Sequence, residues 1–189
     1  MKPILVTGAH RTGTTWVGRV LSSSSAVTYI SEPLHVQHSM GVLAAPVQHW
    51  YTYICEENED VFLHAYQDML RFRYRTWASI QELDSWKRCL KMGRDQIVFF
   101  RAKLLDHLPL IKDPFAVFSV PWFSRKLNSR IVICVRHPLA FVSSLKRLGW
   151  SFDFNHLLDQ PLLVRDHLDK FRDRVVFMRT REEDIVGQG

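Results

Sequence analysis

The feature that most constrains the fold is a glycine-rich turn between an apolar run and a helical segment near the N-terminus. The apolar run, residues 3–7, is typical of a buried parallel strand and ends at Gly8. Residues 8–15 then have the frame G-x-x-x-x-G-x-[ST] of a phosphate-binding loop, and residues 14–21 follow with helical spacing of apolar side chains. Strand, turn and helix in this order predict a site where backbone N–H groups converge on an anion.

Further along the chain, apolar runs of strand length alternate with segments of helical spacing. Strands are expected at 27–31, 110–112 and 130–136, and helices at 58–80, about 95–105 and from 138 onwards. The run at 130–136 is continuously apolar between its two arginines, as a strand covered on both faces requires. The alternation predicts an α/β fold: a P-loop-containing, three-layer arrangement with a mostly parallel sheet. One domain, 1–189, is expected, with a helical insertion after the second strand at about 41–108.

Composition restricts partners and compartment. The chain has 25 Lys and Arg against 19 Asp and Glu, a net charge of +6, which favours an anionic partner. Its 3 cysteines contain no CxxC pair, so a disulfide or zinc framework is not expected and a reducing cytoplasm is. No apolar run approaches the ~20 residues of a membrane span, and the first residues do not resemble a secretion signal. We therefore expect a cytoplasmic protein without a membrane span.

The loop departs from that of ATP- and GTP-hydrolysing enzymes in the position of its cation. The lysine that reaches the β- and γ-phosphates is replaced by Thr14, and a cation stands earlier, at Arg11. Where such an enzyme usually has a magnesium-binding Asp at a strand end, this chain has Arg136, and Ser144 follows eight residues later. A second phosphate and no metal ion fit this pattern. Taken alone, Arg136 and Ser144 are equally well explained as structural or surface residues.

Together these segments resemble the sulfotransferases that use 3′-phosphoadenosine-5′-phosphosulfate (PAPS), in particular their bacterial branch. Residues 11–16 resemble the family's motif that grips the 5′-phosphosulfate. Residues 136–144 resemble the motif in which an arginine and the serine eight positions later bind the 3′-phosphate. Ser-Glu-Pro at 31–33 and Ile-Lys-Asp-Pro at 111–114 are also similar, so the resemblance runs through most of residues 3–160.

The resemblance implies transfer of a sulfuryl group from PAPS to a hydroxyl or amine of a small-molecule acceptor, without magnesium, leaving 3′-phosphoadenosine-5′-phosphate (PAP). Negative charge develops on the departing phosphate, so positioned cations and amides supply the catalysis. By analogy, Arg11 contacts the bridging oxygen and the leaving phosphate. The other cofactor-binding residues implied by the resemblance are Thr12, Gly13, Thr14, Thr15, Trp16, Arg136 and Ser144.

An acceptor hydroxyl must also lose its proton to a carboxylate or histidine within hydrogen-bond reach. Glu32 is the predicted base, because it follows the second strand at the edge where open parallel sheets bind ligands. His35 and Asp113 are reserve candidates, whereas His107 precedes the third strand and is interpreted as a false match. Lys112 either meets an anion of the cofactor or substrate or is simply solvated.

The insertion is the expected location of an acceptor pocket, although helical spacing assigns most of its aromatic side chains to the core first. These are Trp50, Tyr51, Tyr66, Tyr74 and Trp77. After residue 161 no segment resembles the family's Arg-, Lys- and Gly-rich loop that closes over the cofactor. Residues 174–184 are compatible with a strand followed by acidic residues or with an amphipathic helix.

Other functions stay open on the sequence. One is a non-catalytic, nucleotide-binding remnant of the same fold, and another is a P-loop small-molecule kinase, favoured by the loop but opposed by its missing lysine. A third is a nucleic-acid-binding module, suggested by the alternating arginines and rings of residues 71–77. If that stretch is helical, residues two apart face different sides, so nucleic acid is not expected as a partner. The acceptor is not specified, and a homo-oligomer is left open.

Overall fold

The fold is built on a parallel sheet, as the sequence predicts. The computed structural model describes residues 2–81 and 85–180. Within these residues the sheet has the order β2-β3-β1-β4, with every neighbouring pair parallel. Its strands are β1 (Ile4–Thr7), β2 (Val27–Ser31), β3 (Leu108–Lys112) and β4 (Arg130–Ile133). Because all the strands run in one direction, the residues that follow them meet at one edge of the sheet.

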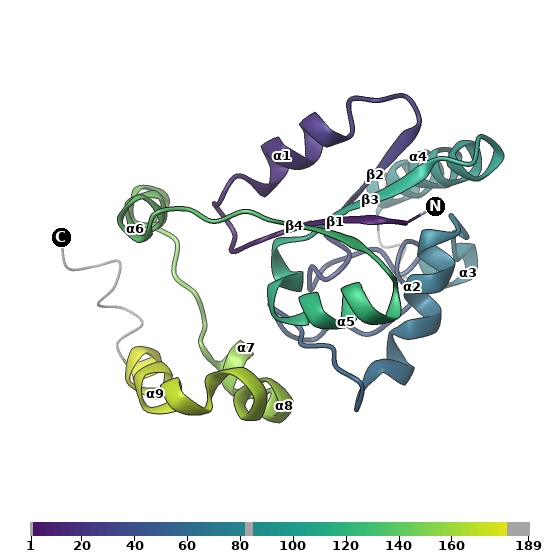
Figure 1. Cartoon of the computed structure of the whole chain (residues 1–189). Coiled ribbons are helices and arrows are strands. Elements are labelled where there is room, and N and C mark those ends of the chain that lie inside the picture. The colour runs from purple at the N-terminus through teal and green to yellow at the C-terminus, as the bar shows by residue number, and fades with distance from the viewer. Residues whose placement is uncertain (1, 82–84, 181–189) are drawn as a thin grey trace.

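Helices cover both faces of the sheet, which confirms the three-layer α/β prediction. Figure 1 shows α1 on one face and α5 on the other, with α6 beyond the carboxyl ends of the strands. The helices are α1 (Thr14–Leu21), α2 (Leu63–Leu70), α3 (Thr76–Ile80), α4 (Trp86–Leu104), α5 (Val120–Lys126), α6 (Pro138–Leu148), α7 (Asn155–Leu158), α8 (Pro161–Leu163) and α9 (Arg172–Thr180). Shorter helical turns are η1 (Glu59–Val61), η2 (Pro114–Ser119), η3 (Val164–Leu168) and η4 (Asp169–Phe171).

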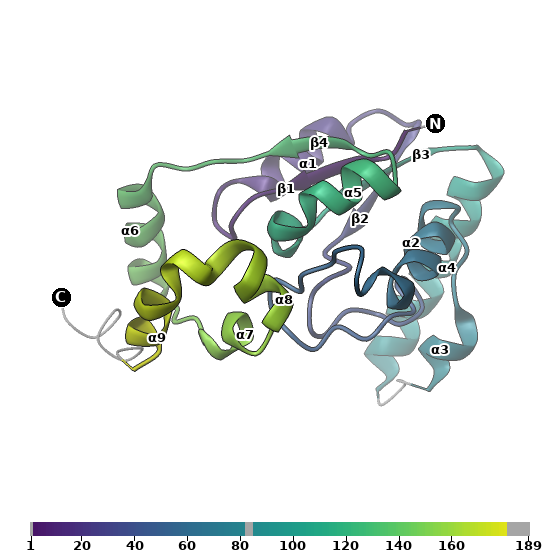
Figure 2. The ribbon, with the colours of Figure 1, turned by 60° about the horizontal axis from the view of Figure 1, so that its bottom comes forward.

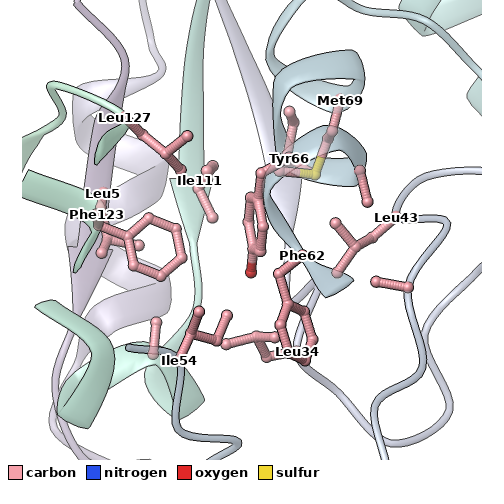
Figure 3. Close-up of a cluster of buried hydrophobic side chains, with 14 of the residues drawn as sticks. Leu5, Leu34, Leu43, Ile54, Phe62, Tyr66, Met69, Ile111, Phe123 and Leu127 are labelled. Atoms are coloured by element: carbon pink, nitrogen blue, oxygen red, sulfur yellow. The ribbon is translucent and has the colours of Figure 1, made fainter. Parts of the chain in front are cut away.

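The main core lies between the sheet, α5 and the segment that follows β2 (Figure 3). Leu5 and Ile111 supply the sheet side and Phe123 the α5 side, and all three are fully buried. Tyr66 of α2 points between them and Phe62. Each such side chain contributes about 1.5–3 kcal/mol when it leaves water, so this cluster attaches the insertion firmly to the sheet.

The insertion is only partly helical. It contains α2, α3 and α4, but residues 32–58 form loops and turns. Pro33 and Pro46 lack the backbone N–H that a helix interior needs, which disfavours a helix in this part. The loops nevertheless supply core side chains, including Leu34, Leu43 and Ile54.

The predicted continuous helix over 58–80 is wrong between α2 and α3. The chain turns at Phe72, which has φ +52°, and Arg73 N–H donates to the Asp68 carbonyl at 2.9 Å. Phe72 is buried and Tyr74 packs over Gly41, whereas Arg73 and Arg75 point outward and pair with Asp68. Phe72 and Tyr74 therefore belong to the core, whereas Trp77 is 82% exposed, so the rings of this alternation form no continuous stacking surface.

Three further predictions need correction. The fourth strand is β4, which ends at Ile133 instead of 136 and is not covered on both faces: it is an edge strand, and Ile133 is 53% exposed. The helix predicted from about 95 begins at Trp86. Residues 174–178 lie in α9, so the helical alternative holds there, while residues 181–184 lie outside the described part of the chain.

No helix in the described ranges combines the length and the apolar character that crossing a bilayer requires. The three cysteines, Cys55, Cys89 and Cys134, are all free thiols.

This assignment of the core predicts that alanine substitutions at two phenylalanines change the free energy of unfolding by very different amounts. Phe123→Ala should lower the free energy of unfolding by about 3–5 kcal/mol, because it leaves a cavity at a fully buried position. Phe171→Ala, at a side chain that is 51% exposed, should change it by less than about 1 kcal/mol. Urea unfolding followed by circular dichroism measures both, and equal losses would contradict this assignment of the core.

Candidate functional site

The loop after β1 is held in a conformation that requires glycine. Gly8 has φ +142°, and a Cβ there would lie 2.2 Å from the Cys134 carbonyl oxygen. The turn is closed by Thr12, whose N–H and hydroxyl both donate to the Ala9 carbonyl, at 3.3 and 2.6 Å. Arg11 has φ +65°, so the chain curls around the start of α1.

The N-terminus of α1 is open and carries no acidic group. Gly13 caps the helix with φ +95°, no side chain accepts from the first turn, and no acidic residue lies in it. The first N–H groups of a helix have no partner within the helix, and together with its dipole they favour an anion. Apart from Gly13 and its two neighbours in the chain, no described residue has an atom within 4 Å of the point that a Gly13 Cβ would occupy. Thr14 is buried beneath this end, and Thr15 and Trp16 are exposed beside it.

Arg136 and Ser144 lie against this loop, although they are more than 120 residues away in sequence. Arg136 Nη1 donates to the Arg11 carbonyl at 2.9 Å, and Arg11 Nε donates to Ser144 Oγ at 3.4 Å. Ser144 is 2% exposed, whereas both arginines are exposed. No carboxylate in the described parts of the chain forms an ion pair with either arginine. Two uncompensated guanidinium groups thus adjoin the open helix end, which suits a multiply charged anion.

A contact that the sequence did not predict anchors the loop to the insertion. His10 Nδ1 and the Tyr51 hydroxyl are hydrogen-bonded, and the same hydroxyl accepts from His10 N–H at 3.3 Å. Burial raises the pKa of Tyr51 to about 12 and lowers that of His10, so a neutral phenol donates to a neutral imidazole. The imidazole ring also packs edge-on against Trp150. His10 lies in the loop motif and Tyr51 among the aromatic residues of the insertion, but nothing in the sequence pairs them, because their contact depends on how the insertion folds back.

Glu32 and Lys112 form an ion pair at the carboxyl ends of β2 and β3. Glu32 has φ +50°, its N–H donates to the Lys112 carbonyl at 2.7 Å, and its carboxylate pairs with Lys112 Nζ. The Lys112 side chain is 3% exposed and that of Glu32 is 32% exposed. The interpretation of Lys112 as a solvated lysine is therefore wrong. Its stem lies under α1, where a Cβ on Gly18 would come within 3.2 Å of Lys112 Cγ.

The reserve bases lie in different surroundings. Asp113 is fully buried, and its two carboxylate oxygens accept from the N–H groups of Leu34, at 2.6 Å, and Phe115, at 2.9 Å. Burial raises its pKa to about 7. His35 is half-buried against Trp50, and burial lowers its pKa. His107 is hydrogen-bonded to Thr28 Oγ1 at 2.9 Å, near the amino ends of β2 and β3. It therefore lies away from the carboxyl ends of the strands, where Glu32 is.

Two cavities adjoin these residues. One of about 500 Å³ contains Glu32 and His35 in its lining, together with Arg19, Lys91 and Arg94. A second, of about 280 Å³, lies beside His10 and is mainly aromatic, with Trp50, Phe115, Trp150 and Phe152. The aromatic residues considered for an acceptor pocket are mostly elsewhere: Tyr51, Tyr66 and Tyr74 lie in or against the core and Trp77 is 82% exposed. Of the five, only Trp50 lines either cavity.

In the described ranges, no three or more His, Cys, Asp or Glu side chains are grouped so that they could hold a metal ion.

Comparison with known proteins yields one match. The family model described as "Sulfotransferase family" matches residues 3–187, nearly the whole chain. Neither the curated proteins nor the solved structures contain a match.

The burial of Asp113 predicts a pH dependence of stability. Its pKa is about 7 in the folded chain and near 3.8 when unfolded, so between these values the folded state binds more protons and stability falls as pH rises. From pH 5 to pH 7 this group should remove at most roughly 2 kcal/mol. Urea unfolding at both pH values measures the change, which should shrink in Asp113→Asn. The same pH slope in both proteins would rule out the assignment.

Proposed function

The chain belongs to the sulfotransferase family, and we propose that it transfers a sulfuryl group from PAPS to the hydroxyl of a small, anionic acceptor. The observation that carries this proposal is the contact of Arg136 and Ser144 with the Arg11 loop beside the open end of α1. Two groups of anion-binding donors therefore share one edge of the sheet, which suits a nucleotide with phosphates at two positions.

The loop is proposed to hold the 5′-phosphosulfate. Its donors are the backbone N–H groups of residues 13–15 and the side chains of Thr14 and Thr15, at the positive end of the α1 dipole. Trp16, 72% exposed in the first turn of α1, offers a free ring face on which adenine can stack.

The second group is proposed to hold the 3′-phosphate. Arg136 uses Nη1 for the Arg11 carbonyl, which leaves Nε and Nη2 of its planar fork for phosphate oxygens. Ser144 is positioned two helical turns into α6, where its buried hydroxyl accepts from Arg11 and can donate its own hydrogen to a phosphate.

Bound PAPS would supply the sulfuryl group, whose transfer leaves negative charge on the departing 5′-phosphate. Arg11 and the loop amides meet that charge without having to reorganise. Glu32 takes the proton of the acceptor hydroxyl, which leaves the oxygen free to attack sulfur as the bridging S–O bond breaks. Lys112, buried beside Glu32, acts as a positioning residue that fixes the carboxylate at the sheet edge.

The larger cavity is proposed as the acceptor site, because the partly exposed Glu32 carboxylate belongs to its lining. Arg19, Lys91 and Arg94 give the cavity an excess of positive charge over Glu32 and Asp95. Val98 and Phe99 add an apolar wall. Such a lining favours an acceptor that carries a negative group besides its reacting hydroxyl.

Binding of PAP tests the 3′-phosphate assignment. Arg136→Ala should weaken binding about 10- to 100-fold, because it removes a charge-assisted contact to phosphate. Arg130→Ala, an exposed arginine at the other end of β4, is the matched control and should bind as the wild type does. Isothermal titration calorimetry in EDTA measures both variants, and equal affinities would defeat the assignment.

The proposal that Glu32 is the base is tested by measuring nucleotide binding and turnover separately. Glu32→Gln should keep its affinity for PAP while PAP release from PAPS, measured with a panel of anionic phenols and sugars, falls about 10²- to 10⁴-fold. Glu56→Gln, at a carboxylate that is 70% exposed, is the control. Unchanged turnover in Glu32→Gln would remove this residue from the mechanism. PAP binding without turnover in the wild type would favour the non-catalytic alternative.

A further inference from the structure

Helix α4 carries a continuous apolar stripe on the side that faces away from the core. Its inner side buries Phe99 and Ala102. The outer stripe repeats at alternating steps of four and three residues, interrupted by Gly93, and its five large side chains are between 61% and 73% exposed. They are Trp86, Leu90, Ile97, Phe100 and Leu104. Steps of three and four keep these side chains on one face of a helix, so the stripe is an uncovered apolar surface.

A row of cations borders this stripe on one side. At 100° per residue, Lys87, Lys91, Arg94 and Arg101 fall on one flank of the helix, and all four are exposed. Lys91 and Arg94 also line the cavity that contains Glu32, so Lys87 and Arg101 are the two cations that belong to the outer surface alone. Arg94 pairs with Asp95, while the described residues offer no ion-pair partner to the other three. Asp95 is the only acidic residue of α4, and its side chain is 16% exposed. The outer face is therefore apolar and positively charged.

Helix α3 extends the same surface. Gln96 Nε2 of α4 donates to Thr76 Oγ1 of α3 at 2.9 Å, which brings the two helices into contact beside the stripe. Trp77, the next residue, is 82% exposed. Figure 2 shows α3 and α4 together at the end of the molecule away from α6, so this surface is separate from the Arg136 and Ser144 contact.

We propose that the outer face of α4 docks on an anionic membrane surface, with the helix lying in the plane of the interface. An apolar stripe with tryptophan, bordered by lysine and arginine, is the composition that binds at this depth, since the rings enter the acyl boundary while the cations meet headgroup charges. A second copy of this chain packed antiparallel on the stripe would bring the two rows of cations together. The helix lies on the bilayer, because its charged flank prevents it from spanning.

The outer face of α4 requires a partner that combines negative charge with an apolar interior. An anionic lipid bilayer offers both along the full length of the stripe. A protein partner would need an acidic helix matched to the spacing of these side chains. The inference does not depend on sulfuryl transfer, and its test uses no nucleotide.

Vesicle sedimentation with the full chain tests the docking surface. The chain should bind phosphatidylcholine vesicles that contain about one third phosphatidylserine at ~0.1 M salt, and should not bind pure phosphatidylcholine. Leu104→Ser should weaken binding about tenfold. Leu139→Ser is the matched control, because Leu104 and Leu139 are 73% and 72% exposed and only the former lies on the stripe.

The contribution of the cations on α4 is tested with two double variants that each remove two positive charges. Lys87→Gln with Arg101→Gln should weaken binding about 25-fold, from about fivefold for each cation removed. Lys146→Gln with Arg147→Gln, exposed on α6, should change it less than about twofold. Circular dichroism checks that all variants keep the wild-type fold.

Three results would overturn the inference. One is equal binding to neutral and anionic vesicles, and another is an equal loss in the two charge variants, which would indicate diffuse attraction by the whole chain. The third is a concentration-dependent dimer that Leu104→Ser abolishes, with no binding to vesicles, since a second copy would then cover the stripe.

Discussion

The site depends on the contact between the loop after β1 and the segment after β4. Arg136 donates to the carbonyl of Arg11, and Arg11 reaches Ser144, so that two distant motifs meet at the open end of α1. These bonds hold positive groups near one another, an arrangement that costs electrostatic energy until an anion arrives. The anion-binding character of this edge therefore follows from the folded backbone as much as from the residue types.

The insertion contributes to the same edge in two ways. Its core residues attach it to the sheet, and Tyr51 then bonds to His10 and supports the phosphate loop from the side. Asp113, at the end of β3, binds the N–H group of Leu34 in the loop after β2, which places Glu32 beside Lys112. These buried polar groups thus fix the position of the proposed base, Glu32, relative to the loop after β1 that is proposed to hold the phosphosulfate.

The sequence specifies the parts that depend on local pattern. The loop and α1 follow from glycines and apolar spacing, and the parallel sheet from the alternation of segments. Strand order cannot be predicted from such patterns. The apolar run at 131–135 would look the same in an edge strand and in a central one, so the sequence does not reveal that β4 is exposed. The sequence does not reveal the break between α2 and α3 at Phe72, because the helical spacing of aromatic residues continues through the turn. The burial of Lys112 cannot be predicted locally either, since it depends on Gly18 in α1.

A crystal structure of the chain with PAP is the most direct test of the proposal that two groups of donors hold the two phosphates of one nucleotide. We expect the 5′-phosphate within hydrogen-bond distance of the backbone N–H groups of residues 13–15, and the 3′-phosphate on Arg136 and Ser144 of the same molecule. A nucleotide bound with either phosphate away from its group, or bound at another edge of the sheet, would contradict it.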